Sequence, residues 1–420
     1  MNLKRTVLYT SFGYGAYSAC NLLMGILIGR MGHSELGIYG TAVSLCNPFM
    51  VLAALNLRSL YVSQVFRDFK VENYLATRLV NFLIALVTVF FWAQYKLHGN
   101  TNLAWFTIIF MLGNVFDQTA DMYFGIYQVR NRVDFLALSQ TLRGILSILL
   151  FYLFVRLSHN SLYWGIAGSS LASFLMLVGF DFPVASWVET QVRGQFIWPR
   201  IVKCDYLTIV KSAFPLTLSV FMDAFALAYP IVMVAQVLGA AANSSITAYT
   251  YLISLGQIFI TGVTMAIAPR LGESFNKNNE KEFKRVVNWG GLMAAVIGGG
   301  ILLLTYVAGP ILIHSVFRKT ITVDEGLFLW IVCGGALRFG TSILGTAITS
   351  AKWVKGQFFW SLPRLLLALL ITGPLVHRFG LYGAAWAMLV PTLLKLILGA
   401  FILWFVMNRW RQEKLLPSNS

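Results

Sequence analysis

The chain has 420 residues, of which 58% are hydrophobic and 11% are charged, and its mean hydropathy is +0.71. An ordinary soluble domain is about 25% charged, so this composition excludes a soluble globular protein and indicates a polytopic helical membrane protein. The formal net charge of +16 lies mostly in short loops. Membrane topology and lipid headgroups therefore explain it better than nucleic acid does.

Apolar segments long enough to cross a bilayer as helices recur along the whole chain, since one span needs about 20 residues. The first follows Lys4 and Arg5 without a small-residue cleavage site, so we predict a retained helix rather than a signal peptide. The predicted spans are 8–29, 37–62, 74–95, 103–125, 134–156, 162–180, 209–238, 246–268, 288–307, 326–349, 357–376 and 382–407.

A polar stretch near the middle of the chain divides these spans into two equal sets. Residues 1–180 are predicted to form an N-terminal six-helix bundle, 181–208 a cytoplasmic linker and 209–420 a C-terminal six-helix bundle. Two bundles that start on the same side of the membrane would be parallel repeats related by a pseudo-twofold axis, as in many transporters. The charged segment from Glu273 to Val287 is predicted to be a helix, either solvated within a loop or lying along the inner surface.

The distribution of charge gives the orientation. The predicted cytoplasmic segments hold most of the 32 basic residues and the outer segments hold few, and basic residues are retained in the cytoplasm. Both termini are therefore predicted to be cytoplasmic. The four cysteines have no CxxC spacing, and the histidines fall near predicted outer helix ends. We accordingly expect no disulfide framework, metal site or cofactor.

Ionisable residues inside the predicted spans are the candidates for function, because a charge at bilayer depth is costly. The basic candidates for substrate binding are Arg58, Arg143, Arg338, Arg364 and Lys395. Arg338 and Lys395 lie roughly 18–20 Å from their outer helix ends. At this depth their side chains are too short to snorkel to the membrane surface. Arginine suits a phosphate ligand because its planar fork binds two oxygens. Arg78 and Lys211, nearer the inner surface, are predicted to snorkel.

The acidic candidates are Asp117, Asp121 and Asp223. Asp117 and Asp121 share one helix face. Asp117 lies at the depth of Arg143, so it is either half of a buried ion pair or a site for a coupling proton or cation. Asp223 lies near the bilayer centre and needs either a partner or a proton; Lys395 or Arg338 is the expected partner.

Two parts of the sequence resemble one known family. The segment that begins IGRMGHSELGIYG at Ile28, and the later AYTYLISLGQIFITGVTMAIAPRLGESF, are similar to the polysaccharide-transport branch of the multidrug/oligosaccharidyl-lipid/polysaccharide (MOP) exporter superfamily. The resemblance covers essentially the whole chain in topology. It implies a MATE-like fold of two bundles and a Wzx-like O-antigen flippase for lipopolysaccharide assembly. This chain has twelve predicted helices where such proteins often have fourteen.

The leading functional hypothesis is that the protein moves undecaprenyl-diphosphate-linked oligosaccharide across the bacterial inner membrane by alternating access, coupled to H⁺ or Na⁺. Glycan polymerases would be its partners in polysaccharide biosynthesis. A cation-coupled multidrug exporter of the same superfamily is the first alternative, although cationic drugs would favour a cavity rich in carboxylates. A membrane glycan polymerase or ligase is the second, disfavoured by short outer loops. No GxxxxGK[ST] motif for ATP binding occurs.

Overall fold

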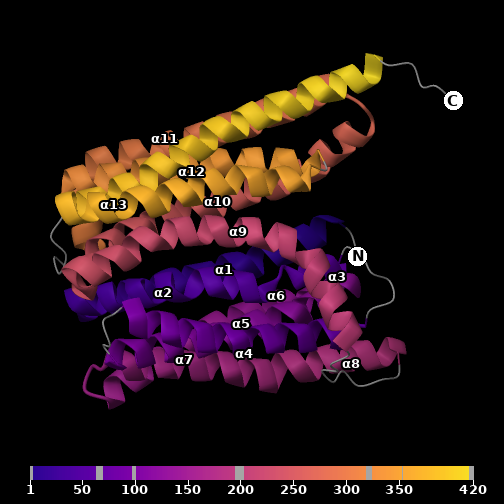
Figure 1. The fold of residues 1–420 in the computed structure, drawn as a ribbon. Coiled ribbons are helices and arrows are strands. Elements are labelled where there is room, and N and C mark those ends of the chain that lie inside the picture. Colours follow the sequence, from indigo (N-terminus) through magenta and orange to yellow (C-terminus); the bar gives the residue numbers. More distant parts are fainter. Residues whose placement is uncertain are drawn as a thin grey trace. The chain divides into compact units, whose positions relative to one another are not determined.

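The computed structural model describes residues 3–62, 70–96, 101–193, 203–317, 324–351 and 353–415. These residues form helices, and no strand occurs among them. The chain divides into two compact units, Met1–Thr217 (unit 1) and Leu218–Ser420 (unit 2). In Figure 1 the helices of unit 1 run from indigo to magenta, and those of unit 2 continue to yellow.

Unit 1 is a bundle of long helices with two short ones. Its helices are α1 (Leu3–Met31), α2 (His33–Ala54), α3 (Leu57–Val62), α4 (Val71–Lys96), α5 (Thr101–Val129), α6 (Val133–Leu157), α7 (Leu162–Met176), the π-helical turn η1 (Leu177–Asp181), α8 (Phe182–Arg193) and the start of α9 (Lys203–Leu238). Helix α1 packs against α6, α6 against α7, and α5 against both α4 and α7. Aromatic side chains such as Tyr74, Phe124 and Tyr127 fill one core of this unit.

Unit 2 contains the rest of α9, the short turn η2 (Ala240–Ala242), α10 (Asn243–Asn276), α11 (Glu280–Phe317), α12 (Glu325–Ser350) and α13 (Val354–Leu415). Helix α12 packs against α13 and α11, and α10 packs against α11 and α12. Inside α13, Gly380 has φ 58° and ψ −127°, which is not helical. Only glycine adopts such angles readily, so α13 is two helices, 354–379 and 381–415, joined at this residue.

The prediction of twelve membrane-spanning helices is confirmed. Ten segments of the described chain are long and apolar enough to cross a bilayer, and one of them, Gly356–Trp410, contains both halves of α13. Helix α5 has the length of a further span although its polar residues lower its hydropathy. Together with α3 and α8, which extend neighbouring spans, these segments account for the predicted set.

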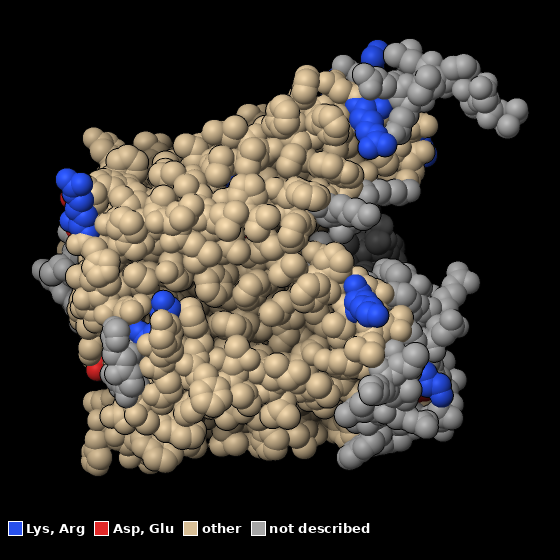
Figure 2. Space-filling model, in the orientation of Figure 1, with Lys and Arg blue, Asp and Glu red and all other residues tan. Residues whose placement is uncertain are grey.

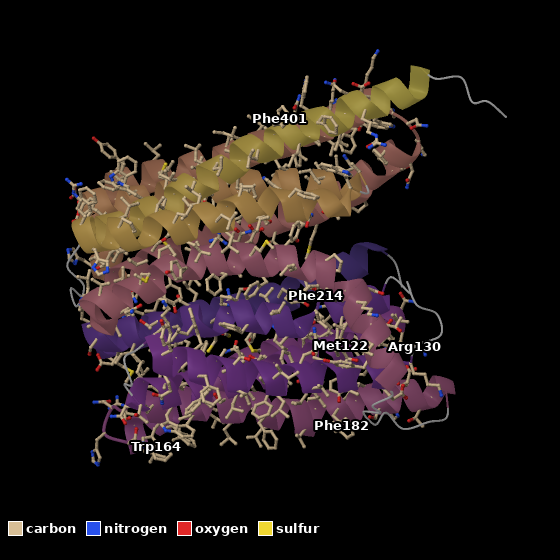
Figure 3. All side chains as sticks on the ribbon, in the orientation of Figure 1. Met122, Arg130, Trp164, Phe182, Phe214 and Phe401 are labelled. Carbon is tan, nitrogen blue, oxygen red and sulfur yellow. The ribbon has the colours of Figure 1, made fainter. Side chains whose placement is uncertain are left out.

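The outer surface of each unit suits a lipid environment. Large apolar side chains are exposed along α4, α11 and α13, including Leu83, Leu303 and Phe401. Trp164 and Phe401 point away from the helices, whereas Met122 lies between them (Figure 3). In the view of Figure 2, Lys and Arg gather at the helix ends and the wall between them is nearly free of charge. This is the pattern expected of helices that cross a membrane.

Two predicted surface segments are helical over much of their length. Within the predicted linker 181–208, Asp181 is buried and residues up to Arg193 are helical, while α9 begins at Lys203; residues 194–202, including Arg200, lie outside the described residues. The predicted surface helix from Glu273 to Val287 is the end of α10 and the beginning of α11. In both places polar residues extend long helices beyond the apolar span, which hydropathy alone does not show.

Candidate functional site

One partly buried carboxylate in unit 2 contacts two cations, one from each half of α13. Asp223 on α9 accepts a hydrogen bond from the Arg364 guanidinium, with 3.1 Å between Nη1 and Oδ1, and its Oδ2 accepts one from the Lys395 ammonium. The Ser361 hydroxyl also donates to Oδ2, at 3.1 Å. The side chains of Arg364 and Lys395 are only 6% and 7% exposed. Both oxygens of this carboxylate are therefore used to hold cations that have left water.

Further contacts fix the two cations in position. The Arg364 guanidinium donates to the Thr392 hydroxyl at 3.3 Å. The Lys395 ammonium lies 4.4 Å from the centroid of the Trp360 ring, an arrangement in which the negative face of the ring attracts the charge. The Trp360 indole N–H in turn donates to the Lys395 carbonyl. The cations are thus positioned by several groups and do not depend on Asp223 alone.

Arg338 on α12 completes this group but is unpaired. Its side chain is half-buried, and no residue in the described part of unit 2 makes a hydrogen bond or ion pair with its guanidinium. It lies within electrostatic range of Arg364, Lys395 and Asp223. We call Arg338, Arg364, Lys395 and Asp223 the cationic cluster. It holds three cations and one carboxylate, so it carries an excess of positive charge among the helices of unit 2.

Unit 1 contains a neutralised network instead. Arg143 on α6 contacts two carboxylates, Asp117 on α5 and Asp181 on η1. The Tyr17 hydroxyl donates to Asp117 at 2.7 Å, and the Ser139 hydroxyl donates to Asp181 at 2.5 Å. The ion pair between Asp117 and Arg143 considered in the sequence analysis is therefore present. Asp181 was missed there because it stands at the polar end of its apolar segment.

A second group of unit 1 surrounds Asp121 on α5. Arg58 lies 2.6 Å from one of its oxygens, and Arg78 lies 3.4 Å from the other. The prediction that Arg78 snorkels to the surface is wrong: its side chain is 2% exposed and donates to the carbonyls of Gln118 and Ala54. Its surroundings on α2 and α5 replace the water it would otherwise need. Lys211, by contrast, is exposed.

The two units differ in charge balance. In unit 1, three arginines are matched by the three carboxylates Asp117, Asp121 and Asp181. In unit 2, the contact predicted between Lys395 and Asp223 is confirmed, but Arg364 and not Arg338 is the second partner. A matched network is suited to holding helices together. A cluster with excess positive charge is suited to binding an anion.

Comparisons with known proteins agree with this architecture. No family model matches the chain. A capsular polysaccharide biosynthesis protein, CapF of Staphylococcus aureus, is 22% identical over 381 residues, which are 90% of this chain and 93% of that protein. This relationship and the solved structures that follow confirm the predicted resemblance to the MOP superfamily.

Two solved structures are informative. A MATE family multidrug resistance transporter of the MOP superfamily in an inward-facing conformation gives a TM-score of 0.74 at 15% identity, covering 94% of this chain and 96% of its own. A MOP superfamily transporter from Pyrococcus furiosus, described as having a binding pocket of reverse polarity, gives a TM-score of 0.63 at 15% identity, covering 97% and 95%. The chain therefore has the MATE-like fold that was predicted.

Proposed function

We propose that this protein is a flippase that moves an undecaprenyl-diphosphate-linked oligosaccharide, such as an O-antigen or capsular repeat unit, across the bacterial inner membrane. The observation that carries this proposal is the excess positive charge of the cationic cluster, and in particular the unpaired guanidinium of Arg338. An unpaired cation at bilayer depth costs free energy. Binding of an anionic group gives a reason for its presence.

A diphosphate matches this cluster chemically. It carries several acceptor oxygens, and a guanidinium can donate two parallel hydrogen bonds to one phosphate. Arg338 would make the first contact because it has no partner to lose. Asp223 would keep Arg364 and Lys395 in place while no cargo is bound, and the cargo phosphates would then share these two cations with it. No covalent step is required, so alternating access of the cluster to the two membrane faces would suffice for transport.

The roles of the remaining sequence-predicted residues follow from their contacts. Arg58 and Arg143 are paired with carboxylates, so we assign them a weaker part in cargo binding than Arg338. Asp117 and Asp121 have side chains about a quarter exposed, at 23% and 25%. Each can receive a proton or Na⁺ in exchange for its arginine, and such an exchange would couple ion movement to a change of helix packing.

The similarity to CapF, a capsular polysaccharide biosynthesis protein, supports a role in polysaccharide transport. The excess of basic residues in the predicted cytoplasmic segments supports cytoplasmic termini. A multidrug exporter is the competing function, because solved structures with this fold include multidrug transporters. A pocket for cationic drugs needs carboxylates free to meet them. In the described spans, Asp117, Asp121, Asp181 and Asp223 each contact a basic side chain.

Reconstitution tests the proposal. Purified protein is placed in vesicles with a labelled undecaprenyl-diphosphate oligosaccharide, and the fraction of label that becomes accessible to an external glycan-modifying enzyme is followed over time. We expect movement of the unchanged lipid and no efflux of a cationic dye. Dye efflux without lipid movement would establish the drug exporter instead, and lengthening of the glycan would establish a polymerase.

A further inference from the structure

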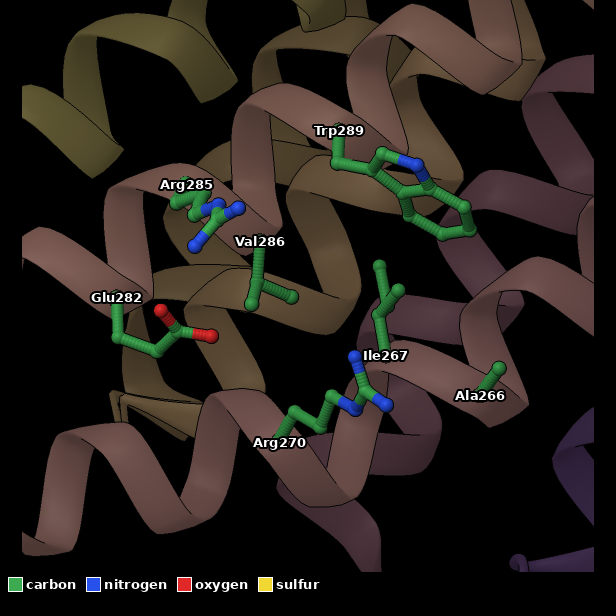
Figure 4. A pocket seen from close by; sticks show the side chains of 7 residues that line it. All are labelled: Ala266, Ile267, Arg270, Glu282, Arg285, Val286 and Trp289. Atoms are coloured by element: carbon green, nitrogen blue, oxygen red, sulfur yellow. The ribbon is translucent and has the colours of Figure 1, made fainter.

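A cavity of about 560 Å³ lies in unit 2 between α10 and α11, beside the turn that joins them. Its lining comes from both helices, with Arg270 on α10 and Glu282, Arg285 and Trp289 on α11 (Figure 4). None of these residues belongs to the cationic cluster. The cavity is therefore a separate site, near the helix ends and away from the middle of the spans.

The two arginines of this cavity are available to a ligand. Arg270 and Arg285 are exposed, and no hydrogen bond or ion pair joins either side chain to another residue among those described in unit 2. Two of the neighbouring lysines behave differently: Lys277 lies 2.6 Å from Glu273, and Lys284 lies 2.8 Å from Glu280. These two lysines are paired and lie outside the cavity, whereas the two arginines that line it are unpaired.

The chemistry of the lining favours an anion with an apolar attachment. Two arginines and the single carboxylate of Glu282 leave the described lining with excess positive charge. The buried side chains of Ile267 and Val286 supply an apolar floor. Trp289 is half-exposed at the rim, and tryptophan is enriched where a membrane meets water. A single arginine on the surface is satisfied by hydrogen bonds to water. Two arginines that line the same cavity are placed to donate hydrogen bonds to one anion.

An apolar stripe leads from this cavity along α11. Trp289, Leu292, Val296 and Leu303 are exposed and spaced by three, four and seven residues, which places them on one helix face. Between them, a side chain added at Gly299 or Gly300 would meet nothing within 4 Å. The helix surface therefore has a shallow depression at these two glycines. A hydrocarbon chain attached to a group in the cavity could lie along it.

We propose that the cavity between α10 and α11 binds the phosphate group of a membrane lipid, with Arg270 and Arg285 holding the phosphate and the α11 stripe holding the lipid chain. Basic pockets between transmembrane helices on the cytoplasmic side are suited to such headgroups. Two lipids carry this chemistry: an anionic phospholipid of the surrounding leaflet, and the prenyl diphosphate of the proposed cargo. The site does not depend on the proposed transport function, because binding requires no translocation.

Native mass spectrometry of the purified full-length protein tests this site. Phosphatidylglycerol, undecaprenyl diphosphate and inorganic phosphate are added separately, and the bound fraction is measured against concentration. We expect at least one of the two lipids to bind about tenfold or more weakly to the Arg270→Gln, Arg285→Gln double variant than to the unchanged protein, since each arginine donates charge-assisted hydrogen bonds. The lipid that shows the loss identifies the source of the phosphate.

A matched control makes the same change of charge beside the same turn, at two residues that do not line the cavity. The Lys277→Gln, Lys284→Gln double variant should bind both lipids as the unchanged protein does, and Arg270→Lys, Arg285→Lys should retain most of the binding. Equal lipid binding by the arginine double variant would overturn the proposal, as would an equal loss in the lysine control. Displacement of the lipid by inorganic phosphate at equal concentration would also overturn the proposal, because the hydrocarbon chain of the lipid would then contribute nothing to the affinity.

Discussion

Replacing Asp223 by Asn tests how the cationic cluster is held together. The substitution keeps the size of the side chain but removes the charge that faces Arg364 and Lys395. Both cations would stay buried, with their own repulsion no longer offset. Ser361 could still donate to the amide oxygen, so the lost interaction is mainly that between charges.

The magnitude follows from burial. Removing one partner of a buried ion pair costs about 3–5 kcal/mol of unfolding free energy. The Asp223 side chain is 27% exposed, so water screens part of the effect, and we expect the lower end, about 3 kcal/mol. Replacing Lys395 by Met in the same protein removes one stranded cation. The double variant should therefore lose less stability than the sum of the single losses, by about 1 to 3 kcal/mol.

The assay is a double-mutant cycle on purified protein, with unfolding by SDS in mixed micelles followed by circular dichroism. The four proteins of the cycle are compared with an Arg378→Gln control, whose exposed side chain should change stability by less than about 0.5 kcal/mol. Strictly additive losses for Asp223 and Lys395 would refute the reasoning, because they would show that the two charges do not depend on each other.

Three further predictions concern other parts of the fold. Gly380→Ala should cost about 1–3 kcal/mol of unfolding free energy in the same SDS assay, since its φ of 58° strains any other residue; an unchanged midpoint would contradict the kink. The Asp324 carboxylate accepts hydrogen bonds from the Tyr382 hydroxyl and, at the start of α12, from the Leu327 N–H, and these bonds lower its pKa. Because its folded-state pKa is below the unfolded value, Asp324 stabilises the fold above pH about 4, and this stabilisation is lost as the pH falls further. In Asp324→Asn the melting temperature should therefore depend less on pH below about 4. The same pH dependence in the variant and the unchanged protein would contradict a stabilising role for this carboxylate. Asp117→Asn should accumulate normally because Arg143 keeps Asp181, yet should shift the pH profile of transport; an unshifted profile would remove Asp117 from ion coupling.

The sequence predicted the helices well because the information is local. Span length and hydropathy depend on neighbouring residues only, so the twelve spans and the position of Arg338 near the middle of its helix could be predicted without a structure. The contacts across helices could not. Helix rotation decides that Asp223 meets Arg364 and Lys395 and leaves Arg338 unpaired.

The errors at helix ends have one physical cause. Arg78 lies two turns into α4, a depth from which an isolated helix would let it reach water, but α2 and α5 enclose it and offer backbone carbonyls. Asp181 follows an apolar run in what looks like a loop, yet η1 turns it toward Arg143. In both cases the surroundings contributed by distant segments, which a single sequence does not reveal, determine where the charge lies.

The central claim is that the cationic cluster serves an anionic cargo and that Arg338 is retained for binding rather than for folding. The most direct measurement compares Arg338→Gln with the unchanged protein in two assays on the same preparation, SDS unfolding and vesicle transport of the diphosphate-linked oligosaccharide. Because no described residue pairs with Arg338, its loss strands no carboxylate and relieves repulsion. The account predicts a variant at least as stable as the original that transports about tenfold or more slowly. A variant that is clearly destabilised, or one that transports at the original rate, would contradict it.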